Sequence, residues 1–97
     1  MITLGGEPVV DWALKFKQEF GSRTWVAGYC NDVMTYIPSL RVLREDVPPL
    51  AQGRWGYEGA QAMTVYGLPA WRWAEDVEDL VNAGARRAVK RVHASGK

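Results

Sequence analysis

The stretch Gly5–Cys30, GGEPVVDWALKFKQEFGSRTWVAGYC, holds the pattern that decides the fold. Its first part predicts a helix over about residues 8–20, because apolar side chains recur at helical spacing and charged ones lie on the other side. Pro8 suits the first helical turn, where its missing N–H is no loss, and Gly21 is a natural C-terminal stop. Residues 24–30 favour a strand without clean alternation, as in an inner strand buried on both faces. A helix followed closely by such a strand is half of an α/β unit.

Three more elements are predicted further along the chain. Ser39 is placed to cap a short helix through Leu40–Glu45. Residues 60–67 form a second strand candidate, and residues 74–92 form a long helix with acidic first turns and basic later turns. The prediction is an α/β fold, or α+β if the strands prove antiparallel, with two main helices packed on a small sheet. The side chains expected to be buried are Val9, Trp12, Phe16, Phe20, Trp25, Val26, Val65, Val77, Leu80, Val81 and Val89.

The length, net charge and cysteine content of the chain limit the class of protein to which it can belong. The chain has 97 residues, which fits one small domain spanning residues 1–97. A net charge of +1 gives no overall attraction to nucleic acid, and the basic later half of the last helix is best explained as a solvated face. Cys30 is the single cysteine, so an internal disulfide is excluded. The sequence shows no membrane-spanning run and no signal peptide at its start, which predicts a soluble, cytoplasmic protein as written.

Five tryptophans in a chain of this size are many. A small domain cannot easily bury all of them with their N–H groups hydrogen-bonded. One interpretation is that some lie on a surface that meets another chain, including a second copy of this one. The other is that they lie at the edge of the chain's own core. The sequence alone leaves both open.

Three places carry side chains suited to catalysis or ligand binding. Glu7 lies between Gly6 and Pro8, and a carboxylate there is also favoured simply by a helix N-terminus. Asn31–Asp32 follows the first predicted strand, where ligands gather in α/β proteins and where turns also use these residues. Tyr57–Glu58 lies between glycines, which also suits a plain tight turn. Phosphate-binding glycine loops, HExxH, CxxC and GxSxG motifs are missing.

The order of these pieces resembles a known enzyme family. The segments GGEPVVDWALKFKQEF, WVAGYCNDVMTYIPSLRVLRE and GYEGAQAMTVYGLP, within about residues 5–69, are similar to the C-terminal part of the catalytic domain of neutral/alkaline non-lysosomal ceramidases. The likeness includes ceramidase-like bacterial proteins. The resemblance implies hydrolysis of the N-acyl bond of ceramide, a step of sphingolipid metabolism, by a zinc-dependent amidohydrolase. Members of that family are often secreted or membrane-associated.

The resemblance also implies roles for particular residues. In that family two histidines, a glutamate and a tyrosine hold zinc. The glutamate matches Glu7 and the tyrosine ligand matches Tyr36. A second tyrosine, which polarises the amide carbonyl, matches Tyr57. Zinc would activate a water molecule, and Tyr57 would donate a hydrogen bond to the developing oxyanion.

The departures from the family pattern shape the functional hypothesis. The family's histidines belong to N-terminal motifs, and His93, the chain's single histidine, matches neither. Catalytic zinc needs about three protein ligands, so Glu7 and Tyr36 alone are too few. Residues 45–54 form an apparent insertion between Tyr36 and Tyr57. We therefore expect a fragment of the catalytic domain that is inactive alone. Its expected partner is a further copy in a homo-oligomer or a histidine-bearing chain. The alternative is a non-enzymatic, tryptophan-rich interaction module.

Overall fold

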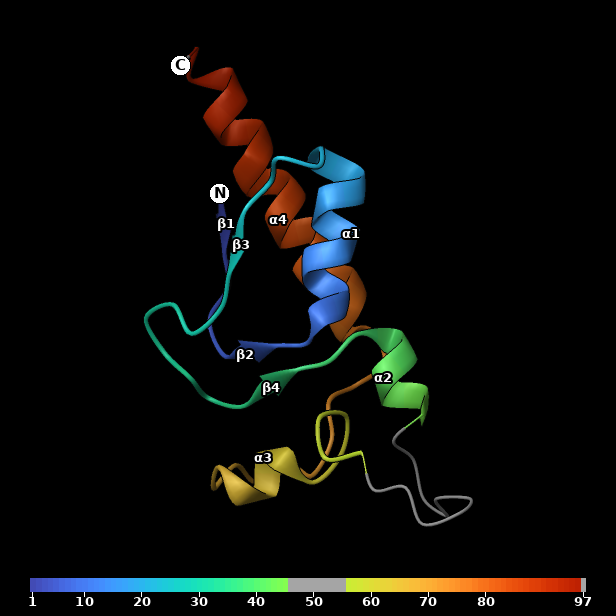
Figure 1. Ribbon diagram of the computed structural model, residues 1–97. Coiled ribbons are helices and arrows are strands. Elements are labelled where there is room, and N and C mark those ends of the chain that lie inside the picture. The colour runs from blue at the N-terminus through green and yellow to red at the C-terminus, as the bar shows by residue number, and fades with distance from the viewer. Residues whose placement is uncertain (46–55, 97) are drawn as a thin grey trace.

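The computed structural model of the chain describes residues 1–45 and 56–96. Apart from Glu45, the predicted insertion 45–54 lies outside the described residues, and so does Trp55. The described elements are, in chain order, β1 (Ile2–Thr3), β2 (Glu7–Pro8), α1 (Val10–Phe20), β3 (Val26–Ala27), β4 (Tyr36–Ile37), α2 (Leu40–Glu45), α3 (Ala62–Val65) and α4 (Val77–Ala94). Figure 1 shows the short strands beside α1, and α4 running past α1 to the far end of the molecule.

Within the described residues the strands form two separate short parallel pairs, whereas a single small sheet was predicted. β1 pairs with β3, so that Ile2 lies opposite Val26. β2 pairs with β4, so that Glu7 lies opposite Tyr36. Parallel pairing requires a crossover between partners, and α1 lies within the crossover of both pairs. The α/β prediction is therefore confirmed, with α1 and α4 as the two main helices.

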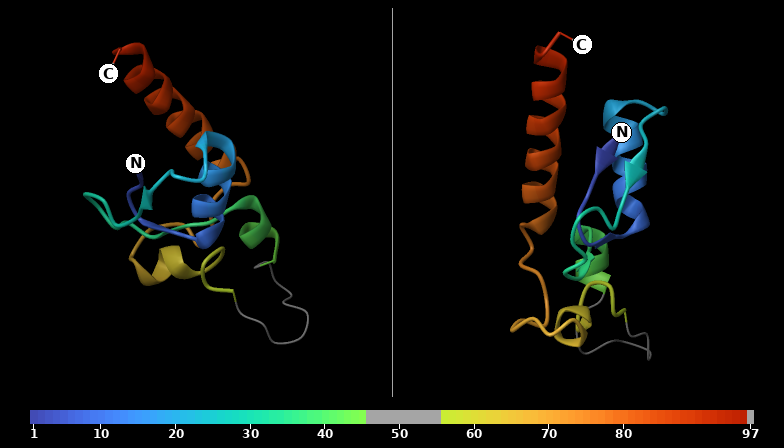
Figure 2. Two further views of the ribbon diagram at one scale, coloured as in Figure 1. Left: turned by 45° about the horizontal axis from the view of Figure 1, so that its top comes forward. Right: turned by 90° about the vertical axis from the view of Figure 1, so that its left-hand side faces the viewer.

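The core lies between the strands and these two helices, which run in the same direction (Figures 1 and 2). Trp12 and Phe16 of α1 are fully buried and pack with Val9, Ile37 and the α4 residue Ala85. Lys15 pairs with Glu78 at 2.7 Å, and Glu19 pairs with Arg86 farther along both helices. Apolar contact and two ion pairs in the same order along both helices thus hold α4 against α1.

The short helix α2 begins as predicted. The Ser39 Oγ accepts a hydrogen bond from the Val42 backbone N–H at 3.3 Å, as an N-cap does. The same hydroxyl donates to the Asp11 carboxylate, which ties α2 to α1. The long helix predicted over 74–92 is also confirmed, although it begins at Val77 and ends at Ala94.

The predicted start of the first helix is wrong by two residues. Pro8 belongs to β2, and the helix begins at Val10. Val9 has extended backbone dihedral angles, and its N–H donates to the Ile37 carbonyl at 3.2 Å. Pairing with β4 therefore competes with the helix for Glu7 and Pro8, and Glu7 lies on a strand.

The strand predicted over 24–30 is much shorter, and its expected burial is wrong. Only Val26 and Ala27 form β3, because the chain turns at Gly28 and Tyr29 has a φ of 57°. Trp25 was expected in the core and is 75% exposed. Among the strands that the structure describes, β3 pairs with β1 alone, so it is not an inner strand of a covered sheet. Val65 and Leu80 are also exposed, contrary to the predicted core.

The second predicted strand, 60–67, is a short helix instead. Ala60 makes an isolated antiparallel bridge with Arg72, and Gln61 then turns the chain with a φ of 70°. From there the N–H of Val65 donates to the Gln61 carbonyl, and that of Tyr66 to the Ala62 carbonyl. These local hydrogen bonds override the strand preference of a segment that pairs with no strand among the described residues.

Candidate functional site

The strand pair β2–β4 brings Glu7 and Tyr36 together. They are direct partners in the parallel register, and both are half-buried. The Glu7 N–H donates to the Thr35 carbonyl at 2.9 Å, which fixes the register on one side. Residues 29 apart in the sequence therefore present an acidic and a phenolic side chain at one place.

Tyr57 joins this pair from the segment that leads to α3. Its ring meets the Tyr36 ring edge-on, with centroids 5.3 Å apart and planes inclined by 74°. This is a favoured geometry for aromatic pairs, because the ring edge is positive and the face negative. Tyr57 is 58% exposed, so one side of its ring is open to solvent. The structure thus brings together all three residues singled out by the resemblance: Glu7, Tyr36 and Tyr57.

The surroundings of Tyr36 favour its protonated phenol. Burial raises the pKa of Tyr36 well above the usual value, and hydrogen bonding with Tyr57 and Glu7 raises it further. The cause is physical: the neutral hydroxyl can donate to the Glu7 carboxylate, whereas a phenolate there would face a like charge. Without a cation, Tyr36 is therefore neutral at physiological pH.

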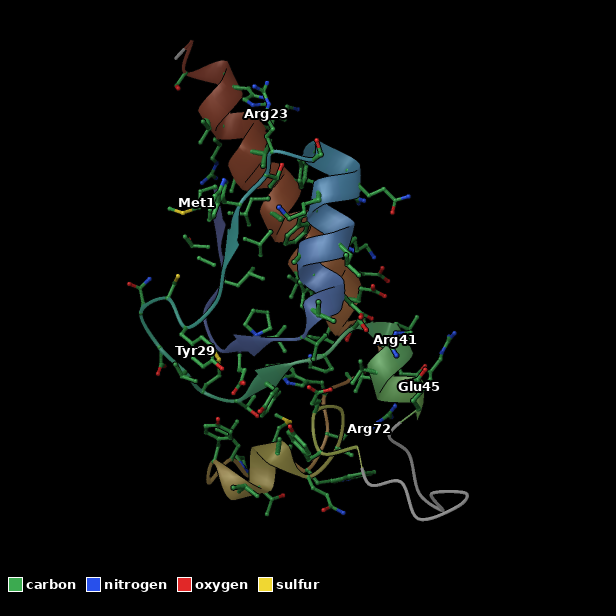
Figure 3. The ribbon with its side chains drawn as sticks, viewed as in Figure 1. Met1, Arg23, Tyr29, Arg41, Glu45 and Arg72 are labelled. Carbon is green, nitrogen blue, oxygen red and sulfur yellow. The ribbon has the colours of Figure 1, made fainter. Side chains whose placement is uncertain are left out.

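Tyr29 is a fourth member of the cluster, and it was not singled out from the sequence. Hydrogen bonding to Glu7 is the main cause that raises the pKa of Tyr29 to about 12, with Tyr66 contributing a smaller electrostatic effect. Figure 3 labels Tyr29 on the loop between β3 and β4, beside β2. The available sequence signal was its position directly after Gly28, near the end of the strand predicted over residues 24–30.

Two indole N–H groups hold β4 in place. Trp73 donates to the Tyr36 carbonyl at 2.8 Å, and Trp12 donates to the Ile37 carbonyl at the same distance. The two tryptophans therefore satisfy carbonyls of the strand that presents Tyr36. This role of Trp73 has no signal in the sequence, because the two residues are 37 positions apart.

Glu7 and Tyr36 have the kind of oxygen atom that binds a divalent cation. Two such ligands are too few for a catalytic zinc site. Carboxylate and phenolate oxygens are both zinc donors, but a catalytic zinc is usually held by three protein ligands. Within residues 1–45 and 56–96, no three His, Cys, Asp or Glu side chains lie together as a metal site. A zinc ion at this cluster would thus be held by Glu7 and Tyr36 plus donors from outside these residues.

His93, the chain's single histidine, lies apart from this cluster. His93 is exposed near the end of α4, which Figure 1 shows leading away from β2 and β4. It lines an apolar groove of about 780 Å³ between β1 and α4. Asn31 and Asp32 are exposed, and Asn31 has a φ of 71°, as in a turn. No helix in the described part of the chain is long and apolar enough to cross a membrane.

Comparison of the chain with models of protein families, with curated proteins and with solved structures finds no match.

Proposed function

We propose that this chain supplies the glutamate–tyrosine half of a ceramidase-like zinc amidohydrolase site. The observation that carries the proposal is the direct pairing of Glu7 with Tyr36, joined by Tyr57 at ring-contact distance. The completed site would hydrolyse the N-acyl bond of a ceramide-like lipid amide. Its histidine ligands would come from a histidine-bearing partner chain, so the chain alone is inactive.

The contacts support a division of roles among the three side chains. Glu7 and Tyr36 are the two oxygen donors that converge, so they would hold the metal. A zinc ion held there would supply Lewis-acid chemistry and an activated water for the hydrolysis of the amide. Tyr57 is in ring contact with Tyr36 and is 58% exposed, so its hydroxyl would donate to the oxygen of a bound amide as negative charge develops there. Tyr36 must give up its phenolic proton when it becomes a ligand.

The proposal is tested by supplying the missing ligands as a small molecule. Zinc is titrated into the full chain by calorimetry, with and without imidazole as a substitute for the histidine side chains. We expect weak binding without imidazole and binding at least about tenfold tighter with it, because imidazole nitrogen completes the ligand set. Ultraviolet difference absorbance should show one tyrosinate forming on zinc binding, and this signal should vanish in Tyr36→Phe.

Matched variants separate the cluster from adventitious zinc binding. Glu7→Gln and Tyr36→Phe should abolish the imidazole-dependent affinity, while Asp79→Asn, which changes an exposed carboxylate of α4, should retain it. Binding that is indifferent to Glu7 and Tyr36 would overturn the proposal. Sub-micromolar binding without imidazole that disappears in Glu7→Gln would instead overturn the claim that a partner must supply ligands.

A second candidate function is favoured by the tryptophans. Trp25 is 75% exposed and Trp71 is 49% exposed, so large aromatic surface remains outside the core. Aromatic side chains are enriched in the centres of protein interfaces. A non-enzymatic self-association module would use this surface, and its test is the oligomeric state of the chain in solution.

A further inference from the structure

We propose that the outer face of α4 binds α4 of a second copy of this chain in an antiparallel pair. The outer face consists of Asp76, Asp79, Leu80, Ala83, Arg87 and Lys90. The proposal gives a surface and an orientation to the self-association named above as the second candidate function, and it is independent of the zinc half-site. Figure 2 shows the strands and α1 together on one side of α4, so a second copy can approach from the opposite side.

The outer face points away from the core of the chain. Ala85 packs in the core, and about two and a half helical turns separate it from Asp76, which puts the two on opposite sides of the helix. Asp76 directly precedes α4 and has helical dihedral angles, so it continues this face. Ala83 is half-buried, and the other members of the face are exposed. The ion pairs between α4 and α1 use Glu78 and Arg86, which lie outside this face.

An antiparallel pair centred on Ala83 brings opposite charges together. Asp79 lies four residues before Ala83 and Arg87 four residues after it, so the two face each other across the pair. Asp76 and Lys90, seven residues before and seven after, match in the same way. Twofold symmetry repeats both matches. A parallel pair would instead place Asp76 opposite Asp76 and Lys90 opposite Lys90, so the charges select the antiparallel orientation.

Leu80 and Ala83 supply the apolar centre of the proposed pair. Ala83 lies on the symmetry axis, where its small side chain lets two helices approach to the short end of the usual range of about 8–10 Å between axes. Leu80 is 63% exposed in the single chain and would be covered by the second helix. Burial of these side chains contributes affinity, while the charges set orientation and register.

Charge reversal tests the pairing in the full chain. Asp76→Lys/Asp79→Lys makes the outer face entirely basic, and Arg87→Glu/Lys90→Glu makes it entirely acidic. In sedimentation velocity, each variant alone should associate at least about tenfold more weakly than wild type, because like charges then meet across the pair. An equimolar mixture should associate within about threefold of wild type, since every reversed position again faces its opposite.

Two further measurements separate this pairing from a general effect of charge or of folding. The single change Arg87→Glu should weaken association at least about threefold, whereas Arg44→Glu, at an exposed position of α2, should leave it unchanged. Raising NaCl from about 0.1 M to 1 M shortens the Debye length from about 10 Å to 3 Å, so it should weaken association of the wild type. An interface formed by Trp25 alone would respond to neither change.

The outcomes distinguish this pairing from self-association as such. If the wild type associates and neither the reversals nor salt changes its affinity, pairing through α4 is overturned, and self-association through another surface stands. If the wild type associates but the mixture of reversed variants remains as weak as each variant alone, the antiparallel register is overturned. A wild-type chain that remains monomeric overturns both the pairing and the self-association.

Discussion

At the scale of single residues, Gly6 controls where Glu7 lies. Its φ is +70°, a conformation that costs an L side chain about 1–2 kcal/mol. A Cβ at this position would also lie 2.7 Å from the Thr35 carbonyl oxygen and 2.9 Å from Ile37 Cγ1. Thr35 directly precedes β4, the strand that presents Tyr36, and Ile37 belongs to it. The missing side chain of Gly6 is therefore what lets β2 approach β4 closely enough to pair.

Gly6→Ala should destabilise the protein by about 3 kcal/mol or more, because backbone strain and overlap with β4 add together. Gly84→Ala is the matched control, since a Cβ there would meet nothing closer than the end of Arg87 at 3.9 Å. That change should stabilise α4 by about 0.5–1 kcal/mol, the usual gain for alanine inside a helix. Urea unfolding of both variants measures the two free energies. An alanine at Gly6 that costs no more than one at Gly84 would contradict the close approach of β2 and β4.

At the scale of elements, α1 and α2 are joined at Asp11. Arg41 donates to both oxygens of this carboxylate, at 2.9 Å each, and Ser39 donates to it as well. These interactions outweigh the effect of burial and lower the pKa of Asp11, with the Arg41 hydrogen bond as the largest cause. Because Ser39 also caps α2, one carboxylate connects the helix that carries the core to the helix that follows β4.

Asp11 should make the stability of the fold depend on acid pH. Its pKa is lower in the folded chain than in the unfolded one, so its contribution is complete above about pH 4 and is lost as pH falls through the folded value. Since Arg41 is largely exposed, we expect only about 0.5–1 kcal/mol. At pH 7 the free energy of unfolding of Asp11→Asn should be lower than that of the wild type. Below pH 3 the two free energies should become equal. Asp79→Asn serves as the comparison, and an equal pH dependence in both variants would argue against the Asp11 contacts.

The elements show which parts of this fold could be read from the sequence. Helices α1, α2 and α4 were predictable because apolar periodicity and the Ser39 cap are local signals. The strands were not, because β2 and β4 exist only through pairing across about 29 residues, and in the part of the chain that the structure describes no strand pairs with 60–67. The same holds for the candidate site. The resemblance selected Glu7, Tyr36 and Tyr57, whereas the contact of Tyr29 with Glu7 depends on a loop conformation that composition does not encode.

At the scale of the whole molecule, the chain is extended, and its strand pairs are not fully covered by other elements. Its radius of gyration is 14.7 Å, against about 12.5 Å for a compact domain of this length, and its longest dimension is 50 Å. Figure 2 shows α4 standing beside the strands with its C-terminal end projecting. Pairs of two strands are marginal on their own. The exposed Trp25 follows the turn after α1 and precedes β3, so it lies next to a strand pair that has little cover.

Trp25 is therefore the residue whose removal should change the assembly state most. We expect the chain to self-associate with rising concentration in sedimentation velocity experiments, because burying this indole would gain several kcal/mol at an interface centre. Trp25→Ser should weaken association by at least about tenfold, while Arg23→Ser, which changes a neighbouring exposed residue without an aromatic ring, should leave it nearly unchanged. Both variants should unfold at the same temperature as wild type, since neither side chain is in the core. A wild-type chain that remains monomeric over a wide concentration range would contradict self-association and leave a different, histidine-bearing chain as the partner that the proposed site requires.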